Sequence, residues 1–260
     1  MVSKELDILL SRLSRIKELG WVENRRIGNQ GGVGNTLEDL LEIEENNLQL
    51  PDFGQWEIKS QRAETSSLLT LFHSEPKPRK ARFVPRILLP CYGWPHQEAG
   101  IKYSENEMSF RQTINASNYS DRGFSVGVDR DNEKIFIRFN SDKIASHHYH
   151  WKKSVEDRIG LEELNPIPYW DFCDIENKLF SKLKNTIYVK ATTKIENCIE
   201  YYHYEHFEVY TGIDIDNFVN LVEEGQVYID FDSRTGHNHG TKFRIRPAYK
   251  DLLYNKQIEI

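Results

Sequence analysis

The chain has 260 residues, of which 38% are hydrophobic and 28% charged, a length that suits one large domain or two closely associated lobes with a self-sufficient core. No apolar run approaches the roughly 20 residues that cross a bilayer, residues 1–5 lack a signal-peptide pattern, and three scattered cysteines outside any CxxC spacing favour the reducing cytoplasm. The net charge of -6 argues against indiscriminate nucleic-acid binding but not against a DNA enzyme, because phosphates respond to a local basic cleft.

The first expected element is an amphipathic helix over 6–19, where leucine and isoleucine recur at helical spacing. A flexible glycine-rich loop over 28–34 follows it and leads into a second helix that is expected to begin at Asn35. Asn35 is a good N-cap, and Glu38 stands three positions later, as in a capping box. Pro51 follows this helix, and strands are expected after it.

The remaining elements alternate between helix and strand. The segment 76–120 contains five prolines and is expected to be irregular. Strands are expected over 68–72, 124–128, 134–139, 186–192, 197–210, 226–231 and 242–246, with helices near 174–184 and 214–223. The strands over 124–128 and 134–139 form a hairpin. This mixture predicts an α/β or α+β fold with a mixed sheet flanked by helices.

The most informative stretch is Pro51-Asp52-Phe53-Gly54-Gln55-Trp56-Glu57-Ile58-Lys59. A two-residue hairpin loop at Gly54-Gln55 would place Asp52 opposite Glu57, and strand alternation puts Lys59 on the same face as Glu57. Opposed carboxylates about 5 Å apart repel each other, so the arrangement needs a reason. A Mg²⁺ ion supplies one, with Lys59 orienting its water or stabilising the transition state. The alternative is an ordinary exposed strand face, since the bare Asp…Glu-x-Lys pattern is common.

The context of this stretch resembles a known family. The segments 28–41, 44–47, 51–59 and 67–72 closely resemble the MvaI/BcnI restriction endonucleases, and MvaI in particular by the short Asp-to-Glu spacing. They resemble more distantly the MutH and Sau3AI nucleases of the PD-(D/E)xK superfamily. The resemblance implies a restriction-endonuclease-like mixed sheet in two lobes around a DNA cleft, with a catalytic lobe over 1–120 and a DNA-recognition lobe over 121–260 that interleave.

The resemblance also implies roles for individual residues. Asp52 and Glu57 match the metal ligands of the family, and Lys59 matches the lysine that completes the site. Glu38 matches an acidic helix residue that lies at the active site in the MutH-like branch, and the capping box is its alternative explanation.

A second polar stretch, residues 232–244, offers hydrogen-bonding side chains for reading DNA bases. Its candidate DNA-binding residues are Arg234, His237, His239, Thr241, Lys242 and Arg244. A polar turn without function is the alternative, and a His-x-His metal pair would need further ligands at a definable spacing. The MvaI-like enzymes carry a similar His-x-His-Gly-Thr-x-Phe-Arg stretch in the lobe that reads DNA, and the segments 194–197 and 201–204 resemble them too.

The segment 76–120 departs from the family's pattern. Its basic residues are candidates for DNA phosphate contacts, and a solvated charged surface is the alternative: Lys77, Arg79, Lys80, Arg82 and Arg86. Tyr201, Tyr202, Tyr204 and Tyr210 stand at imperfect strand spacing, and their expected role is packing of a sheet.

The resemblance implies a type II restriction endonuclease that hydrolyses phosphodiester bonds in double-stranded DNA with Mg²⁺. It implies a monomeric enzyme that acts on a short, nearly palindromic site and leaves 5′-phosphate and 3′-hydroxyl ends. A cognate DNA methyltransferase would act on the same site without binding the chain stably. Two alternatives stay open: a MutH-like strand-nicking repair endonuclease, and a non-catalytic DNA-binding module in which the acidic cluster is structural.

Overall fold

The computed structural model describes residues 4–26, 31–43 and 51–259 and divides into two compact units. Unit 1 is drawn from 1–67, 177–214 and 250–260, and unit 2 from 68–176 and 215–249. The sequence analysis placed a lobe boundary after residue 120, whereas the chain passes between these units four times. Within the described residues, no helix is long and apolar enough to cross a membrane.

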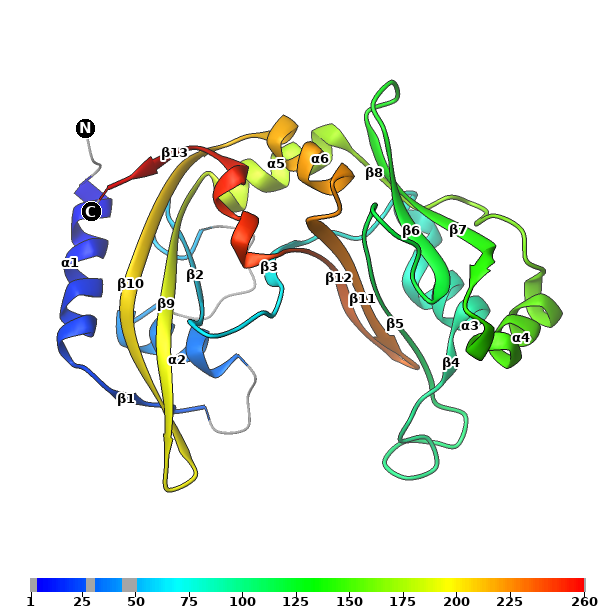
Figure 1. Cartoon of the computed structure of the whole chain (residues 1–260), viewed down its shortest axis with the longest axis horizontal. Coiled ribbons are helices and arrows are strands. Elements are labelled where there is room, and N and C mark those ends of the chain that lie inside the picture. The colour runs from blue at the N-terminus through cyan, green and yellow to red at the C-terminus, as the bar shows by residue number, and fades with distance from the viewer. Residues whose placement is uncertain (1–3, 27–30, 44–50, 260) are drawn as a thin grey trace. The chain divides into compact units, whose positions relative to one another are not determined.

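Unit 1 is built on a mixed sheet that carries two helices (Figure 1). The strand order is β1 (Val22–Glu23), β10 (Ile199–Ile213), β9 (Asn185–Glu196), β2 (Glu57–Arg62), and β13 (Tyr254–Ile258) also pairs with β10. β2 runs parallel to β9, and the other pairs are antiparallel.

One face of this sheet forms the core of unit 1. α1 (Lys4–Glu18) and α2 (Gly32–Leu41) bury their apolar residues in one cluster with Ile58 of β2 and Ile187 and Val189 of β9. Since side chains alternate along a strand, Glu57 and Lys59 project from the opposite face of β2.

The start of α2 corrects the sequence analysis. Gly31 is the N-cap of α2 and no side chain caps the helix, so the expected start at Asn35 and its capping box are wrong. A larger side chain would not fit at the first residue of the helix. A Cβ on Gly32 would lie 2.7 Å from the Tyr202 hydroxyl and 2.9 Å from the Asn24 amide. Gly32 and Gly34 thus belong to the helix and not to the expected loop. Residues 28–30 of that loop, like 44–47, lie outside the described residues.

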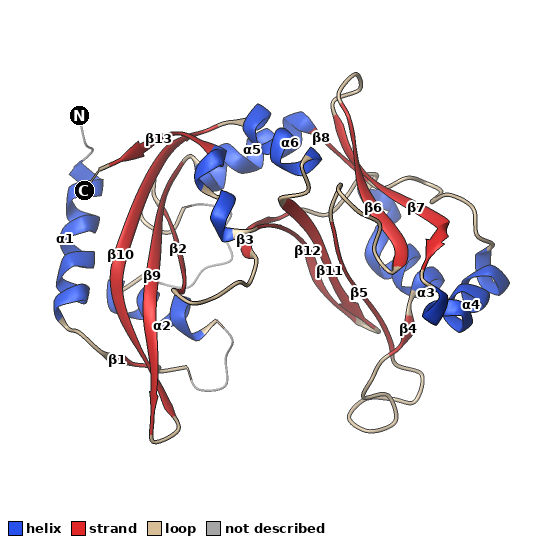
Figure 2. Cartoon of the chain, viewed as in Figure 1, coloured by secondary structure: helices blue, strands red, loops and turns tan. Residues whose placement is uncertain are grey.

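Unit 2 contains two antiparallel sheets (Figure 2). The first has the order β3 (Leu69–His73), β12 (His237–Ile245), β11 (Val227–Arg234), β5 (Met108–Ile114), β4 (Trp94–Pro95). The second has the order β6 (Arg122–Asp129), β7 (Lys134–Ile144), β8 (Tyr169–Asp171). The helices of unit 2 are α3 (Leu89–Tyr92), α4 (Tyr149–Ile159) and α6 (Ile215–Glu223), and α5 (Phe172–Leu183) begins in unit 2 and ends in unit 1.

Most expected elements are present. The hairpin expected at 124–139 is confirmed as β6 and β7, and the strand expected over 68–72 as β3. Within 76–120, the expectation of irregular chain is wrong for α3, β4 and β5. In β5, the polar Gln112 shares one buried face with Phe110 and Ile114, and Ser109 is buried on the other face, so the apolar alternation is weak. Pairing with β11 stabilises this strand. The chain is therefore a mixed α/β protein with several sheets flanked by helices.

Candidate active site

The hairpin predicted within 52–57 is confirmed. The Phe53 amide donates to the Trp56 carbonyl at 2.9 Å, and the Trp56 amide donates back at 2.8 Å. Gly54 has φ of +58°, a conformation that glycine adopts more readily than other residues. Asp52 Oδ2 accepts a hydrogen bond of 2.9 Å from the Ile58 amide. The turn and this bond hold the Asp52 carboxylate beside the first residues of β2.

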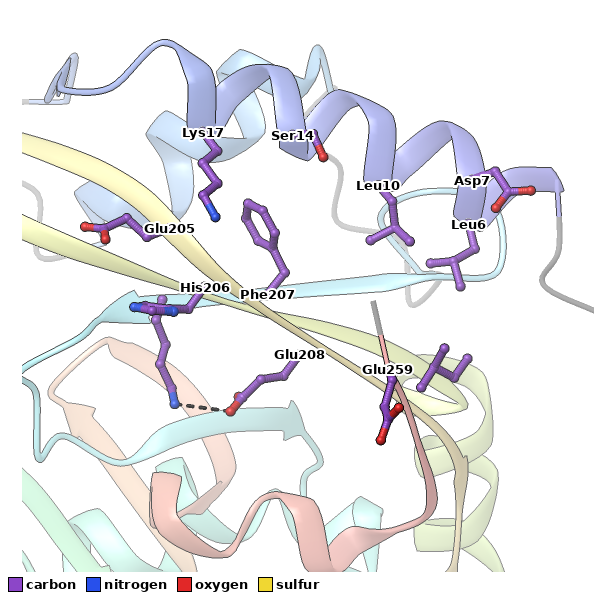
Figure 3. A pocket seen from close by; sticks show the side chains of 12 residues that line it. Leu6, Asp7, Leu10, Ser14, Lys17, Glu205, His206, Phe207, Glu208 and Glu259 are labelled. Atoms are coloured by element: carbon purple, nitrogen blue, oxygen red, sulfur yellow. Dashed lines mark hydrogen bonds and ion pairs between the residues drawn. The ribbon is translucent and has the colours of Figure 1, made fainter.

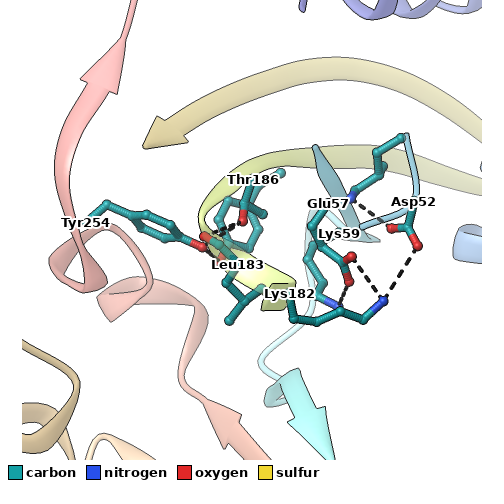
Figure 4. A network of polar contacts seen from close by, with 9 residues as sticks. Asp52, Glu57, Lys59, Lys182, Leu183, Thr186 and Tyr254 are labelled. Carbon is teal, nitrogen blue, oxygen red and sulfur yellow. Dashed lines mark hydrogen bonds and ion pairs between the residues drawn. The ribbon is translucent and has the colours of Figure 1, made fainter. Parts of the chain in front are cut away.

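The three residues that the sequence analysis assigned to a metal site converge at this point (Figure 4). Glu57 is only 2% exposed, and its Oε1 accepts a hydrogen bond of 2.6 Å from Lys59 Nζ. Lys182 Nζ lies 3.2 Å from Glu57 Oε2 and 3.9 Å from Asp52 Oδ1. The two carboxylates therefore approach one ammonium group, and a second ammonium contacts Glu57.

Burial dominates the electrostatics of Glu57. Loss of solvent raises the pKa of the Glu57 carboxyl above its ordinary value of 4.5, although the positive charge of Lys59 opposes the shift. The negative charge of Asp52 raises it further, while Lys182 lowers it. The ionised form of Glu57 thus lies in an environment that disfavours it, and a nearby cation of higher charge would stabilise it.

The donor set fits a divalent metal. Glu57 Oε2 is buried and accepts no hydrogen bond, and its contact with Lys182 is an ion pair without hydrogen-bond geometry. Leaving a charged oxygen buried in this state costs free energy that a coordinated cation would offset. Two carboxylates are the oxygen ligands that Mg²⁺ prefers. Asp52 and Glu57 are therefore suitable ligands for this ion.

Lys182 is a site residue that the sequence analysis missed. It lies in the last turn of α5, and the expected helix near 174–184 included it. The only signal in the sequence was a lysine at the end of a helix, which is common. Its approach to Glu57 depends on how α5 packs, which no local pattern reveals.

Glu38 lies on α2, which packs beside β2. A Cβ on Gly34, one helical turn before Glu38, would contact Ser60 Oγ of β2 at 3.4 Å. α2 thus packs on the face of β2 that carries Ile58 and Ser60, whereas Glu57 and Lys59 project from the other face, and the catalytic role of Glu38 stays a prediction.

The second candidate region forms the hairpin of β11 and β12 in unit 2. Arg234 Nη1 donates to Glu107 Oε1 at 3.0 Å, and its guanidinium lies 4.6 Å from the Tyr103 ring centroid. His237 and His239 are exposed and stack edge to face with centroids 4.3 Å apart. Partial burial lowers the pKa of His239 below 6.5, so its ring is neutral at neutral pH and can both donate and accept hydrogen bonds.

Comparison with known proteins decides the family. The model of the MvaI/BcnI restriction endonuclease family matches residues 10–254. The chain belongs to the MvaI/BcnI restriction endonuclease family. Membership of this family implies a DNA nuclease.

Two solved structures are similar to the chain over nearly its whole length. One is the restriction endonuclease MvaI in complex with its cognate DNA substrate, with a TM-score of 0.79 and 27% identity over 99% of each chain. The other is MvaI in the absence of DNA, with a TM-score of 0.54 and 27% identity over 99% of this chain and 98% of that one. The chain thus has an MvaI-like fold, and 76–120 lies inside the matched residues. No curated protein sequence matches the chain.

In this MvaI/BcnI family member, four of the six predicted DNA-binding residues have polar partners in unit 2, and one of them is Arg234, described above. Thr241 is fully buried, and its hydroxyl donates to Glu75 Oε2 at 3.3 Å. Arg244 pairs with Asp230 at 3.2 Å and donates to the Leu68 carbonyl at 2.8 Å, while Lys242 Nζ lies 3.9 Å from Asp232. Among the six predicted residues, the exposed ones are therefore His237 and His239.

The tyrosines of β10 have the packing role that the sequence analysis expected. Tyr202, Tyr204 and Tyr210 are buried, and the Tyr204 hydroxyl donates to the Val33 carbonyl of α2 at 2.8 Å. They stabilise the sheet that carries the acidic site.

A cavity of about 920 Å³ in unit 1 is separate from the acidic site. It lies between α1 and β10, where Leu10 and Phe207 face charged side chains of both signs (Figure 3). Glu208 in its wall pairs with Lys190 at 3.2 Å. None of the predicted site residues lines the cavity, and its mixed charge favours no single ligand class.

Proposed function

We propose that the chain is a type II restriction endonuclease that hydrolyses phosphodiester bonds in double-stranded DNA with Mg²⁺. The observation that carries the proposal is the convergence of Asp52, Glu57 and Lys59 on one side of the 53–56 hairpin, in a member of an endonuclease family. The similar MvaI structure that holds cognate DNA supports duplex DNA as the substrate.

The residues divide the chemistry between them. Asp52 and Glu57 would hold the metal through the carboxylate oxygens that face Lys182. When bound, Mg²⁺ lowers the pKa of a coordinated water and neutralises charge on the phosphate. Lys59, fixed against Glu57, is placed to orient the attacking water or to offset negative charge in the transition state. Glu38 would add a further acidic group from α2.

The β11–β12 hairpin would supply the DNA contacts. We assign base-edge contacts to Arg234, His237 and His239, and a phosphate contact to Lys242. Thr241 and Arg244 would act through their partners in the sheet by holding β12 in register. The enzyme would work as a monomer with the two lobes around DNA, on a site that a cognate methyltransferase also modifies.

Digestion of phage DNA with the purified chain and Mg²⁺ tests the proposal. We expect discrete fragments, and sequencing their ends reports the recognition site and the cut position together. Nicks confined to one strand would indicate the MutH-like alternative, and a gel shift without cleavage would indicate a non-catalytic binding module. Random fragmentation would contradict site specificity.

A further inference from the structure

A cavity in unit 2 lies beside the turn of the β11–β12 hairpin. Its volume is about 410 Å³, and its polar lining includes Arg79, Arg82, Arg234, His237 and Asn238. Arg79 belongs to the short helix η1 (Arg79–Ala81), and Arg82 lies between it and η2 (Val84–Leu88). Two segments far apart in the sequence therefore form one basic cavity.

Two of the three arginines that line this cavity have no charged partner in the described ranges. Arg79 and Arg82 are exposed, and neither side chain forms an ion pair or hydrogen bond with any residue in the described ranges. The neighbouring Lys77, in contrast, contacts Asp171 and Asp174, both at 2.6 Å. Two free guanidinium groups on a chain of net charge -6 define a local site for an anion.

Glu75, the acidic residue that lines the cavity, does not pair with Arg79 or Arg82. Glu75 accepts hydrogen bonds from the Thr241 amide at 2.9 Å and the Thr241 hydroxyl at 3.3 Å. Its carboxylate is thus directed to β12. Arg234, the third guanidinium, is paired with Glu107.

The arginines and the volume of the cavity suit a sugar–phosphate unit. Guanidinium groups bind phosphate oxygens with paired hydrogen bonds, which makes arginine a preferred phosphate ligand. A volume of 410 Å³ lies at the small end of ligand cavities, roughly 300–1,000 Å³, which suits one nucleotide unit. His237 and Asn238 also line the cavity and offer hydrogen-bonding groups to a base or sugar edge.

We propose that this cavity binds a backbone phosphate of duplex DNA through Arg79 and Arg82, and so positions the β11–β12 turn against the bases. The inference rests on the proposed function, because that function makes duplex DNA the ligand. The segment 76–120 thereby supplies the sequence-independent part of binding, and His237 and Asn238 supply contacts beside it.

The test measures binding to a duplex of random sequence without metal, by fluorescence anisotropy across a range of salt concentrations. Each lost phosphate contact reduces the slope of log binding constant against log salt concentration by about 0.9. This corresponds to about eightfold weaker binding at 0.1 M salt. Because both guanidinium groups would contact the same phosphate, we expect this change for the double variant Arg79→Gln, Arg82→Gln, and a smaller change for either single variant.

A matched control is the double variant Lys143→Gln, Lys153→Gln. Both lysines are exposed cations of unit 2 that make no ion pair with described residues, and neither lines the cavity. An equal change in the control, an unchanged slope in the Arg79/Arg82 variant, or no duplex binding by the natural chain would overturn the inference. Melting curves of all variants check that the fold is intact.

A second arm separates DNA from a free anion. If inorganic phosphate at millimolar concentration protects the natural chain from thermal unfolding through Arg79 and Arg82 while the DNA slope is unaffected, the cavity is an anion site and the inference fails. Because neither arm involves cleavage, a chain that binds DNA as expected but does not cut it would refute only the proposed function.

Discussion

The acidic hairpin at 52–59 and the polar hairpin of β11 and β12 are both short turns crowded with polar residues, but their charges are balanced differently. In the first, Asp52 and Glu57 are close along the chain, and Glu57 keeps a buried oxygen without a hydrogen bond. In the second, Arg234, Thr241 and Arg244 contact partners such as Glu107, Glu75 and Asp230, although Arg244 Nε is also buried without a hydrogen bond. Two carboxylates held close together are a better guide to chemistry than a high density of polar residues.

The largest expected effect comes from removing a charged group of the acidic hairpin. Lys59→Ala or Asp52→Ala should slow DNA cleavage by at least about 100- to 1,000-fold, because each removes a preorganised group at the developing charge. Single-turnover cleavage of plasmid DNA measures the rate, and a gel shift should show retained binding. The control is Lys194→Ala, which removes a lysine paired with Glu196 two positions away on the exposed part of β9. Magnesium-dependent cleavage by either site variant at the natural rate would count against the assignment.

The second prediction distinguishes residues of the β11–β12 hairpin that contact DNA from residues that stabilise the sheet. Thr241→Val should lower the free energy of unfolding by about 1 kcal/mol, because the half-buried Glu75 loses a hydrogen-bond donor. His237→Ala should leave stability within about 0.5 kcal/mol, because the ring is exposed, while it weakens discrimination between DNA sequences. Urea unfolding and cleavage of mismatched sites measure the two effects. Equal stability losses in both variants would show that the exposed and buried residues do not differ in role.

A third prediction concerns the ammonium between the two acids. Lys182→Met should tighten binding of Mg²⁺ or Mn²⁺ about fivefold, because an ion pair worth about 1 kcal/mol no longer competes for Glu57 and Asp52. Calorimetric titration with the metal alone measures this affinity. Lys184→Met, an exposed lysine two residues further on, is the matched control and should leave it unchanged. Weaker metal binding in the Lys182 variant alone would mean that Lys182 supports the site and does not compete.

The smallest effect is a pH dependence of stability without metal. Burial raises the pKa of Glu57 in the folded chain, so the folded state holds a proton that the unfolded state releases near pH 4.5. As pH rises above 4.5, the natural chain should lose stability relative to Glu57→Gln until the raised pKa is passed. Thermal unfolding at several pH values measures this difference, and added Mg²⁺ should reduce it. A difference that stays constant with pH would contradict the buried, unfavourably ionised Glu57.

Much of the candidate site was predictable because it is local. Gly54 and the alternation of β2 place Asp52, Glu57 and Lys59 within eight consecutive residues, and a two-residue turn leaves little freedom in their pairing. A local pattern predicted the wrong start for α2, where Asn35 is a favourable capping residue but does not cap the helix. The fit of Gly32 against Tyr202 and Asn24 moved the helix start to Gly32.

The sequence by itself determined the family resemblance, the 53–56 hairpin and the convergence of two acids and a lysine, because turn geometry and strand alternation act over a few residues. Only the tertiary structure decided that Lys182 reaches the acids, that Thr241 is buried against Glu75, and that Arg79 and Arg82 meet the turn of β11 and β12. These contacts join segments distant along the chain. Their pairing depends on the packing of whole sheets and helices, which no short pattern specifies.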